Sequence, residues 1–134
     1  MAEDINVGAI SETLNNKADR EFGNIPSNYD YVVKSQKPTS SNGYTWYRKY
    51  KSGWVEQGGK STSDGQTVTF PIQMANTEYF ISGMPRETDT GAISSVAFAS
   101  KTTTSVVLYG KRVNAGGFAA GAHPVYWEVK GMAA

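Results

Sequence analysis

The chain has 134 residues, of which 39% are hydrophobic and 12% aromatic, which suits one globular domain with a short attachment and excludes disorder of the whole chain. Its formal net charge is +1, so no overall attraction to nucleic acid is expected. The absence of cysteine excludes disulfides and thiolate metal sites, and no run of 18 apolar residues predicts insertion into a membrane.

The first part of the chain differs from the rest. Val7, Ile10 and Leu14 follow the three-and-four spacing of a coiled-coil seam, which predicts a short helix. A helix of this length is marginal alone in water, so it is expected either in a bundle of identical chains or as a frayed tail. We therefore predict an N-terminal helical or coiled-coil linker over residues 1–23 and a β-sandwich domain over residues 24–134.

The remainder alternates short apolar runs with turn-rich segments, a pattern that predicts an antiparallel β-sandwich or barrel of about eight strands. The sandwich is the fold class we expect. The strand at residues 105–109 is apolar on both faces and should be central. The predicted strands are Tyr29–Lys34, Tyr44–Tyr50, Trp54–Gln57, Thr67–Ile72, Tyr79–Ser82, Ser95–Ala99, Ser105–Tyr109 and a last strand through Val125, Trp127 and Val129.

The segment YTWYRKYKSGWVEQGGK, residues 44–60, predicts a β-hairpin. Trp46 and Tyr50 share one strand face, and Gly53 occupies the turn position where a positive φ is expected. The aromatic residues Trp46, Tyr50 and Trp54 are expected in the core or in a subunit interface, with sugar stacking as the alternative. The segment QGGK lacks the spacing of a phosphate-binding loop and is interpreted as a strand end or bulge.

Three strings in this chain, WYRKYKSGWVEQGG, TVTFPIQMANTEYFI and YWEVKGMAA, resemble the C-terminal tip domain of bacteriophage and prophage tail fibres. The resemblance covers roughly residues 24–134, and the first string is long and unusual. It implies a homotrimer in the virion, at the tip of the tail fibre, made in the host cytoplasm. It also implies non-catalytic binding to a receptor on the bacterial surface, either a lipopolysaccharide or other glycan or an outer-membrane protein.

Catalysis has little support in the sequence. The single histidine, His123, lies in a loop and is more typical of a structural or exposed residue than of a catalyst. No spacing singles out a pair of carboxylates for glycoside cleavage. We therefore predict no catalytic residue, no metal site and no cofactor. The alternatives are a tip that degrades surface polysaccharide and a domain that only caps the trimer.

Receptor contacts are expected in loops at one end of the sandwich. If the strands run up and down, the connections 35–43, 61–66, 84–91 and 110–124 lie at the far end, and 51–53, 73–78 and 100–104 face the shaft. The far-end loops are richer in small polar and charged residues. The candidate receptor-binding residues are Lys37, Asn42, Asp64, Arg86, Asp89, Arg112, Asn114, Phe118 and His123. Arg86 and Phe118 are the strongest of them, with the alternative that Phe118 folds inward to plug a cavity of the trimer.

Overall fold

The computed structural model describes residues 28–62, 64–120 and 124–134. The chain divides into two compact units, Met1–Asp30 and Tyr31–Ala134. The predicted helical segment of residues 1–23, its seam of Val7, Ile10 and Leu14, and the candidate residue His123 lie outside the described residues.

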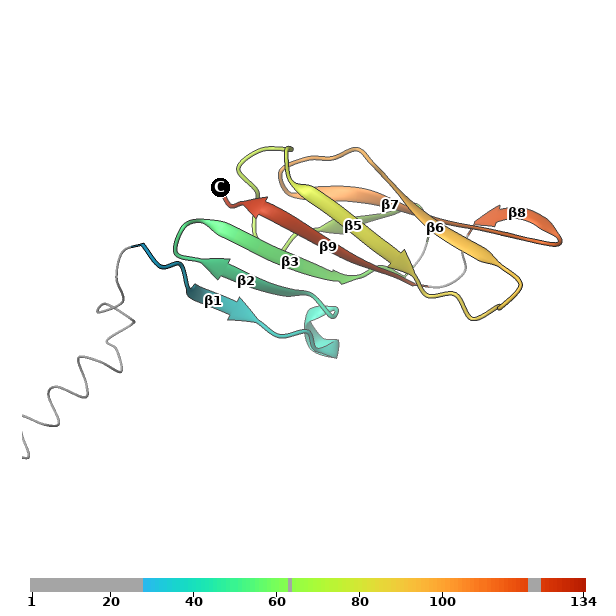
Figure 1. Ribbon diagram of the computed structural model, residues 1–134, viewed down its shortest axis with the longest axis horizontal. Helices are drawn as coiled ribbons and strands as arrows, with labels where there is room; N and C mark the ends of the chain where they lie inside the picture. The colour runs from blue at the N-terminus through green and yellow to red at the C-terminus, as the bar shows by residue number, and fades with distance from the viewer. Residues whose placement is uncertain (1–27, 63, 121–123) are drawn as a thin grey trace, which may run out of the picture. The chain divides into compact units, whose positions relative to one another are not determined.

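The second unit consists of strands joined by turns (Figure 1). A single 3-10 turn, Ser40–Asn42, interrupts the connection after the first strand. The prediction of an all-β fold is confirmed, with nine described strands where about eight were expected. The strands are β1 Val32–Gln36, β2 Trp46–Tyr50, β3 Trp54–Lys60, β4 Gln66–Thr69, β5 Phe80–Pro85, β6 Ile93–Ala99, β7 Ser105–Asn114, β8 Gly117–Ala120 and β9 Val125–Met132.

These strands form two antiparallel sheets. The first has the order β1-β2-β3-β9-β5, and the second has the order β4-β7-β6, with β8 also paired to β7. The strand β7 is central, as its two apolar faces predicted. The segment 110–124 was predicted as a loop, which is wrong: β7 continues to Asn114, and Gly117–Ala120 returns as β8. The short returning strand GFAA has no alternation of apolar and polar residues, so the sequence did not indicate this hairpin.

The core lies between the two sheets, which gives the unit a sandwich-like arrangement. Val125, Trp127 and Val129 alternate on one face of β9 and are all buried, as predicted. Trp127 packs against Phe70, with ring centroids 5.9 Å apart, and Phe70 meets Tyr79 edge-on at 5.3 Å. The buried residues contributed by the opposite sheet are Val68, Val106 and Leu108.

Gln57 is a buried polar residue whose side chain joins β3 to the segment after β4. Its Nε2 donates to the Ile72 carbonyl oxygen and its Oε1 accepts from the Ile72 N–H, both at 2.8 Å. Nε2 also approaches the Met74 sulfur at 3.1 Å. Both ends of the amide therefore have partners, so that its burial is compensated.

The predicted hairpin is confirmed as β2 and β3, and Gly53 has φ +94° in its turn. The buried residue of β2 is Tyr47, so Trp46 and Tyr50 lie on the outer face of the five-stranded sheet. Of the two places expected for Trp46, Tyr50 and Trp54, the core of this chain is excluded, because Tyr47 of β2 and Val55 of β3 turn inward instead. Their burial between subunits stays a prediction.

The antiparallel pairings separate the connections into the two predicted groups, although the strand order in the sheets is not sequential. At one end, called the entry end, the Lys51 N–H donates to the Tyr31 carbonyl, and the Ala134 N–H donates to the Gln73 carbonyl. At the other, called the loop end, the Ser61 and Arg86 N–H groups donate to the carbonyls of Val125 and Pro124. The loop end carries β8 and lies on the right in Figure 1.

Candidate functional site

The described candidate residues all belong to the loop end, but their side chains differ in how they are engaged. Some form ion pairs or close turns, and others are exposed. These candidates are Lys37, Asn42, Asp64, Arg86, Asp89, Arg112, Asn114 and Phe118.

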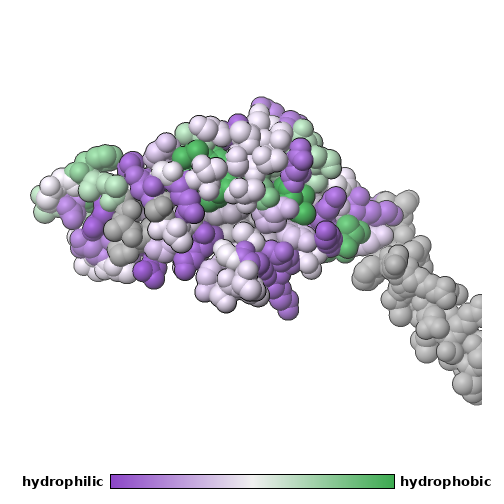
Figure 2. Space-filling model, turned by 180° about the vertical axis from the view of Figure 1, so that it is seen from behind, coloured by the Kyte–Doolittle hydropathy of each residue, from purple (hydrophilic) through white to green (hydrophobic). Residues whose placement is uncertain are grey.

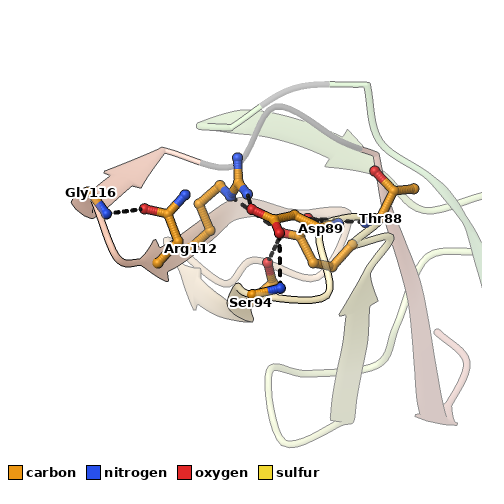
Figure 3. A network of polar contacts seen from close by, with 8 residues as sticks. Thr88, Asp89, Ser94, Arg112 and Gly116 are labelled. Carbon is orange, nitrogen blue, oxygen red and sulfur yellow. Dashed lines mark hydrogen bonds and ion pairs between the residues drawn. The ribbon is translucent and has the colours of Figure 1, made fainter.

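Arg112 of β7 is the centre of a polar network, called here the Arg112 network (Figure 3). Its Nη2 donates to Asp89 Oδ2 at 3.0 Å, and its Nε lies 3.3 Å from Glu87 Oε2. The Ser94 hydroxyl of β6 donates to the same Glu87 oxygen. The network thus joins the connection between β5 and β6 to the outer part of β7. Arg112 and Asp89 therefore already have charged partners within the protein.

Glu87 is held in its charged form. The hydrogen bond from the Ser94 hydroxyl, then that from the Asp89 N–H, and the positive charge of Arg112 lower its pKa from 4.5 to about 2. The Asp89 and Thr88 N–H groups donate to Glu87 Oε1 at 2.9 and 3.0 Å. Each of these contacts favours the carboxylate over the neutral acid. The loop is therefore organised around one ionised side chain, which the sequence analysis did not select.

Three further candidates also contact their own loops or strands. Asn114 Oδ1 accepts from the Gly116 N–H at 2.8 Å in the turn between β7 and β8. Asn42 Oδ1 accepts from the Thr39 N–H at 2.9 Å and its amide donates to the Lys37 carbonyl at 2.8 Å. Lys111 pairs with Asp64 at 2.7 Å. Such local bonds shape turns and loops, so they leave fewer donors and acceptors for a ligand.

Phe118 belongs to an exposed apolar row at the loop end. Ile93 of β6, Val113 of β7 and Phe118 of β8 are paired side by side across three strands. Phe118 and Ile93 are 75% and 74% exposed, so Phe118 does not fold inward within its own chain. In Figure 2 pale green apolar surface lies at this end, on the left, and stronger apolar patches lie along the middle of the face and toward the opposite end. Arg86, in the connection between β5 and β6, is also exposed, and its backbone N–H donates to the Pro124 carbonyl oxygen.

The outer face of the five-stranded sheet carries a groove that the sequence did not indicate. Two adjoining hollows, of about 550 and 360 Å³, share Pro38 and Trp46. We call them together the Trp46 groove. Lys37 is the one candidate residue that lines it. The other lining residues include Tyr44, Arg48, Lys60, Tyr126 and Glu128, which come from β2, β3, β9 and the connection after β1.

The groove is shaped by two consecutive glycines of β3. A Cβ on Gly58 would lie 2.7 Å from Trp46 Nε1 and 2.4 Å from the Trp127 carbonyl oxygen. A Cβ on Gly59 would lie 2.9 Å from the Trp127 ring. Gly58 therefore makes room for the Trp46 indole on the outer face, and Gly59 makes room for Trp127 in the core. This explains the paired glycines of QGGK, which was interpreted as a strand end or bulge and forms the last four residues of β3.

Positive charges stand beside the aromatic rings of the groove. Lys60 Nζ lies 4.8 Å from the Tyr44 ring centroid, within the range of a cation–π contact. Arg48 lies 5.8 Å from the Trp46 ring and pairs with Glu56 at 3.4 Å. Among the described residues, no carboxylate forms an ion pair with Lys37 or Lys60. The alternation of aromatic and basic residues in WYRKY was the signal that could have indicated this surface.

Within residues 28–62, 64–120 and 124–134, no group of three or more histidine, cysteine or acidic residues could hold a metal ion. In the same residues, no helix is long and apolar enough to cross a membrane. No family model, curated protein or solved structure matches this chain.

Proposed function

We propose that this chain is the receptor-binding tip domain of a phage tail fibre, which attaches the particle to a molecule on the bacterial surface. The resemblance of its hairpin and C-terminal strings to fibre tips supports this role. The observation that carries the proposal is the polarity of the second unit. Tyr31 and Ala134 lie at the entry end, and connecting segments and the exposed row of Phe118 gather at the opposite end. An attachment domain needs exposed side chains at the end away from its connection to the particle.

Attachment is non-catalytic in this proposal. The loop end offers exposed apolar side chains, hydrogen-bonding loops and basic residues, which suit adhesion. Several copies per particle raise a weak affinity through multivalent contact. Release of reducing sugar from host lipopolysaccharide or capsule by the purified chain would contradict this part and favour a tip that degrades polysaccharide.

We further propose that the chain is a homotrimer. The outer face of the five-stranded sheet exposes Phe80 and Met84 of β5 and Met132 of β9, which is unusual for adjacent strands of a lone domain. Sedimentation at micromolar concentration is expected to give about three times the chain mass of 14.5 kDa. A monomer under these conditions would contradict the proposal.

The test of the function is competition for adsorption. The purified chain is expected to block adsorption of the parent particle and to lose its own binding to host mutants that lack either lipopolysaccharide sugars or one porin. Phe118→Ala and Arg86→Ala, at the loop end, should weaken competition. The matched exposed controls, Lys51→Ala and Gln73→Ala at the entry end, should not. Loss of competition from the two controls alone would overturn the assignment of the loop end.

A further inference from the structure

We propose that the Trp46 groove binds an acidic sugar, a ring that carries a carboxylate or phosphate group, within the host's surface glycan. This inference rests on the attachment function proposed above and names the chemistry of the ligand. Three features of the groove favour such a ligand: its aromatic surface, its distribution of charge and its size.

The aromatic surface is the first of these features. Tyr44, Trp46 and Tyr126 line the groove from the connection after β1, from β2 and from β9. An aromatic face offers apolar area to the C–H side of a sugar ring, while the polar atoms at its edge can meet hydroxyl groups. Because Gly58 has no side chain, Trp46 lies close against the sheet, where its indole has little freedom. A fixed ring loses little entropy when it binds.

The charges select the class of sugar. Lys37 lines one hollow and Lys60 the other, and neither has an ion-pair partner among the described residues. Lys60 is held beside the Tyr44 ring at 4.8 Å, so its ammonium group is already positioned. By contrast, the carboxylate that lines the groove, Glu128, is paired with Lys130 at 3.0 Å. Charge complementarity therefore favours an anionic ligand.

Size and remaining polar groups agree with a short saccharide. Each hollow, of about 550 or 360 Å³, falls within the range of about 300–1,000 Å³ that small-molecule sites occupy. Carboxylate oxygens can accept hydrogen bonds from hydroxyl groups, and Glu128 forms its ion pair through Oε1. The ligand would thus place its acidic group near Lys60 in one hollow and its hydroxyl groups toward Lys37 and Glu128 in the other.

The experiment is calorimetric titration of the full chain with three matched probes. They are a disaccharide that contains glucuronic acid, its neutral counterpart with glucose in the same linkage, and the counterpart with glucose 6-phosphate in that position. The acidic disaccharide should bind about tenfold more tightly than the neutral one, the difference that one charge-assisted contact supplies. Comparing the two acidic probes distinguishes a carboxylate-bearing from a phosphate-bearing glycan. Equal binding of acidic and neutral disaccharides, or no binding of any probe, would overturn the proposal.

Variants locate the binding. Lys60→Gln should remove most of the preference for the acidic probe, and Trp46→Phe should weaken acidic and neutral probes together. The matched control is Lys51→Gln, because Lys51 also lies over a tyrosine ring, 5.4 Å from Tyr31, but at the entry end. An unchanged preference in Lys60→Gln, or an equal loss in Lys51→Gln, would contradict the site.

Competition with the particle separates this inference from the function on which it rests. If the Lys60→Gln and Trp46→Phe chains still block adsorption as well as the unaltered chain, the attachment function stands and the Trp46 groove is not its glycan site. If the unaltered chain blocks nothing, the attachment function fails. If Trp46→Phe changes the sedimentation mass, the groove is a subunit contact and the sugar site is wrong.

Discussion

The Arg112 network and the Trp46 groove lie at the same end of the domain and both contain basic side chains, but they use them differently. Arg112 has two carboxylates beside it, Glu87 and Asp89, at 3.3 and 3.0 Å. Lys60 has an aromatic ring beside it and no carboxylate partner in the described part of the chain. The contrast separates charges that hold a loop in place from charges that remain available to a ligand.

This difference predicts different consequences of substitution. Removing a member of the network leaves another charged group without its partner, so the cost appears as a loss of stability. Removing a cation from the groove leaves no such group behind, so the cost should appear in binding. Stability and ligand affinity measured on the same variants therefore test whether the two regions differ in this way.

The largest loss of stability is expected from Gly58→Ala, because Gly58 lies against the Trp46 indole of the groove. The added Cβ would lie 2.4 Å from the Trp127 carbonyl oxygen, a backbone atom that cannot move freely, and 2.7 Å from Trp46 Nε1. Overpacking of this kind destabilises by about 1–3 kcal/mol. Urea unfolding followed by tryptophan fluorescence should show the loss.

Gly91→Ala is the matched control for that substitution. Its new Cβ would approach no closer than 3.4 Å, to the Asp89 carboxylate, in a loop at the same end. Its free energy of unfolding should stay within about 0.5 kcal/mol of the unaltered chain. Equal destabilisation by both substitutions would show that the close approach at Gly58 is not the cause.

Arg112→Ala should have the next largest effect. The Arg112 side chain is 20% exposed, and its loss leaves Glu87 and Asp89 without their cation. Because solvent partly screens these pairs, we expect a loss of about 1 kcal/mol in the free energy of unfolding. Binding of the acidic disaccharide should persist under conditions where the variant is folded. Loss of that binding in the folded variant would remove the distinction between network and groove.

The pH dependence of Glu87 provides a sharper test of the network. Its folded-state pKa of about 2 lies below the ordinary value of 4.5, so its stabilising contribution is fully present above about pH 4.5 and disappears as pH falls toward 2. Glu87→Gln should therefore destabilise the domain at pH 7, and the difference between the two chains should shrink between pH 4.5 and 2. Urea unfolding across this range measures it. A difference that does not change with pH would contradict the network.

The sequence was a good guide to the core and to the hairpin. Alternating apolar residues correctly placed Val125, Trp127 and Val129, and the turn glycine Gly53 has the expected positive φ. Which face of β2 turns inward could not be predicted, because Trp46 and Tyr47 are both aromatic. That choice depends on β3, where Val55 and Gln57 face the core beside Tyr47.

The candidate site was predictable only in part. Antiparallel pairing grouped the expected loops at one end, but sequence spacing does not show which charges meet. Arg112 and Asp89 are 23 positions apart and pair only because β6 and β7 are neighbours. The Trp46 groove combines residues from β2, β3 and β9, so it requires a strand order that periodicity does not provide.

The smallest effect on stability is expected where the effect on binding should be large. Lys60→Gln and Lys37→Gln remove cations that have no ion-pair partner in the described residues, and Lys60 loses only its contact with the Tyr44 ring. Surface substitutions of this kind usually change the free energy of unfolding by less than about 0.5 kcal/mol. We therefore expect unfolding curves close to that of the unaltered chain and weaker binding of the acidic disaccharide by both variants. If either lysine variant lost as much stability as Arg112→Ala, that lysine would stabilise the fold. The distinction between the Trp46 groove and the Arg112 network would then be wrong.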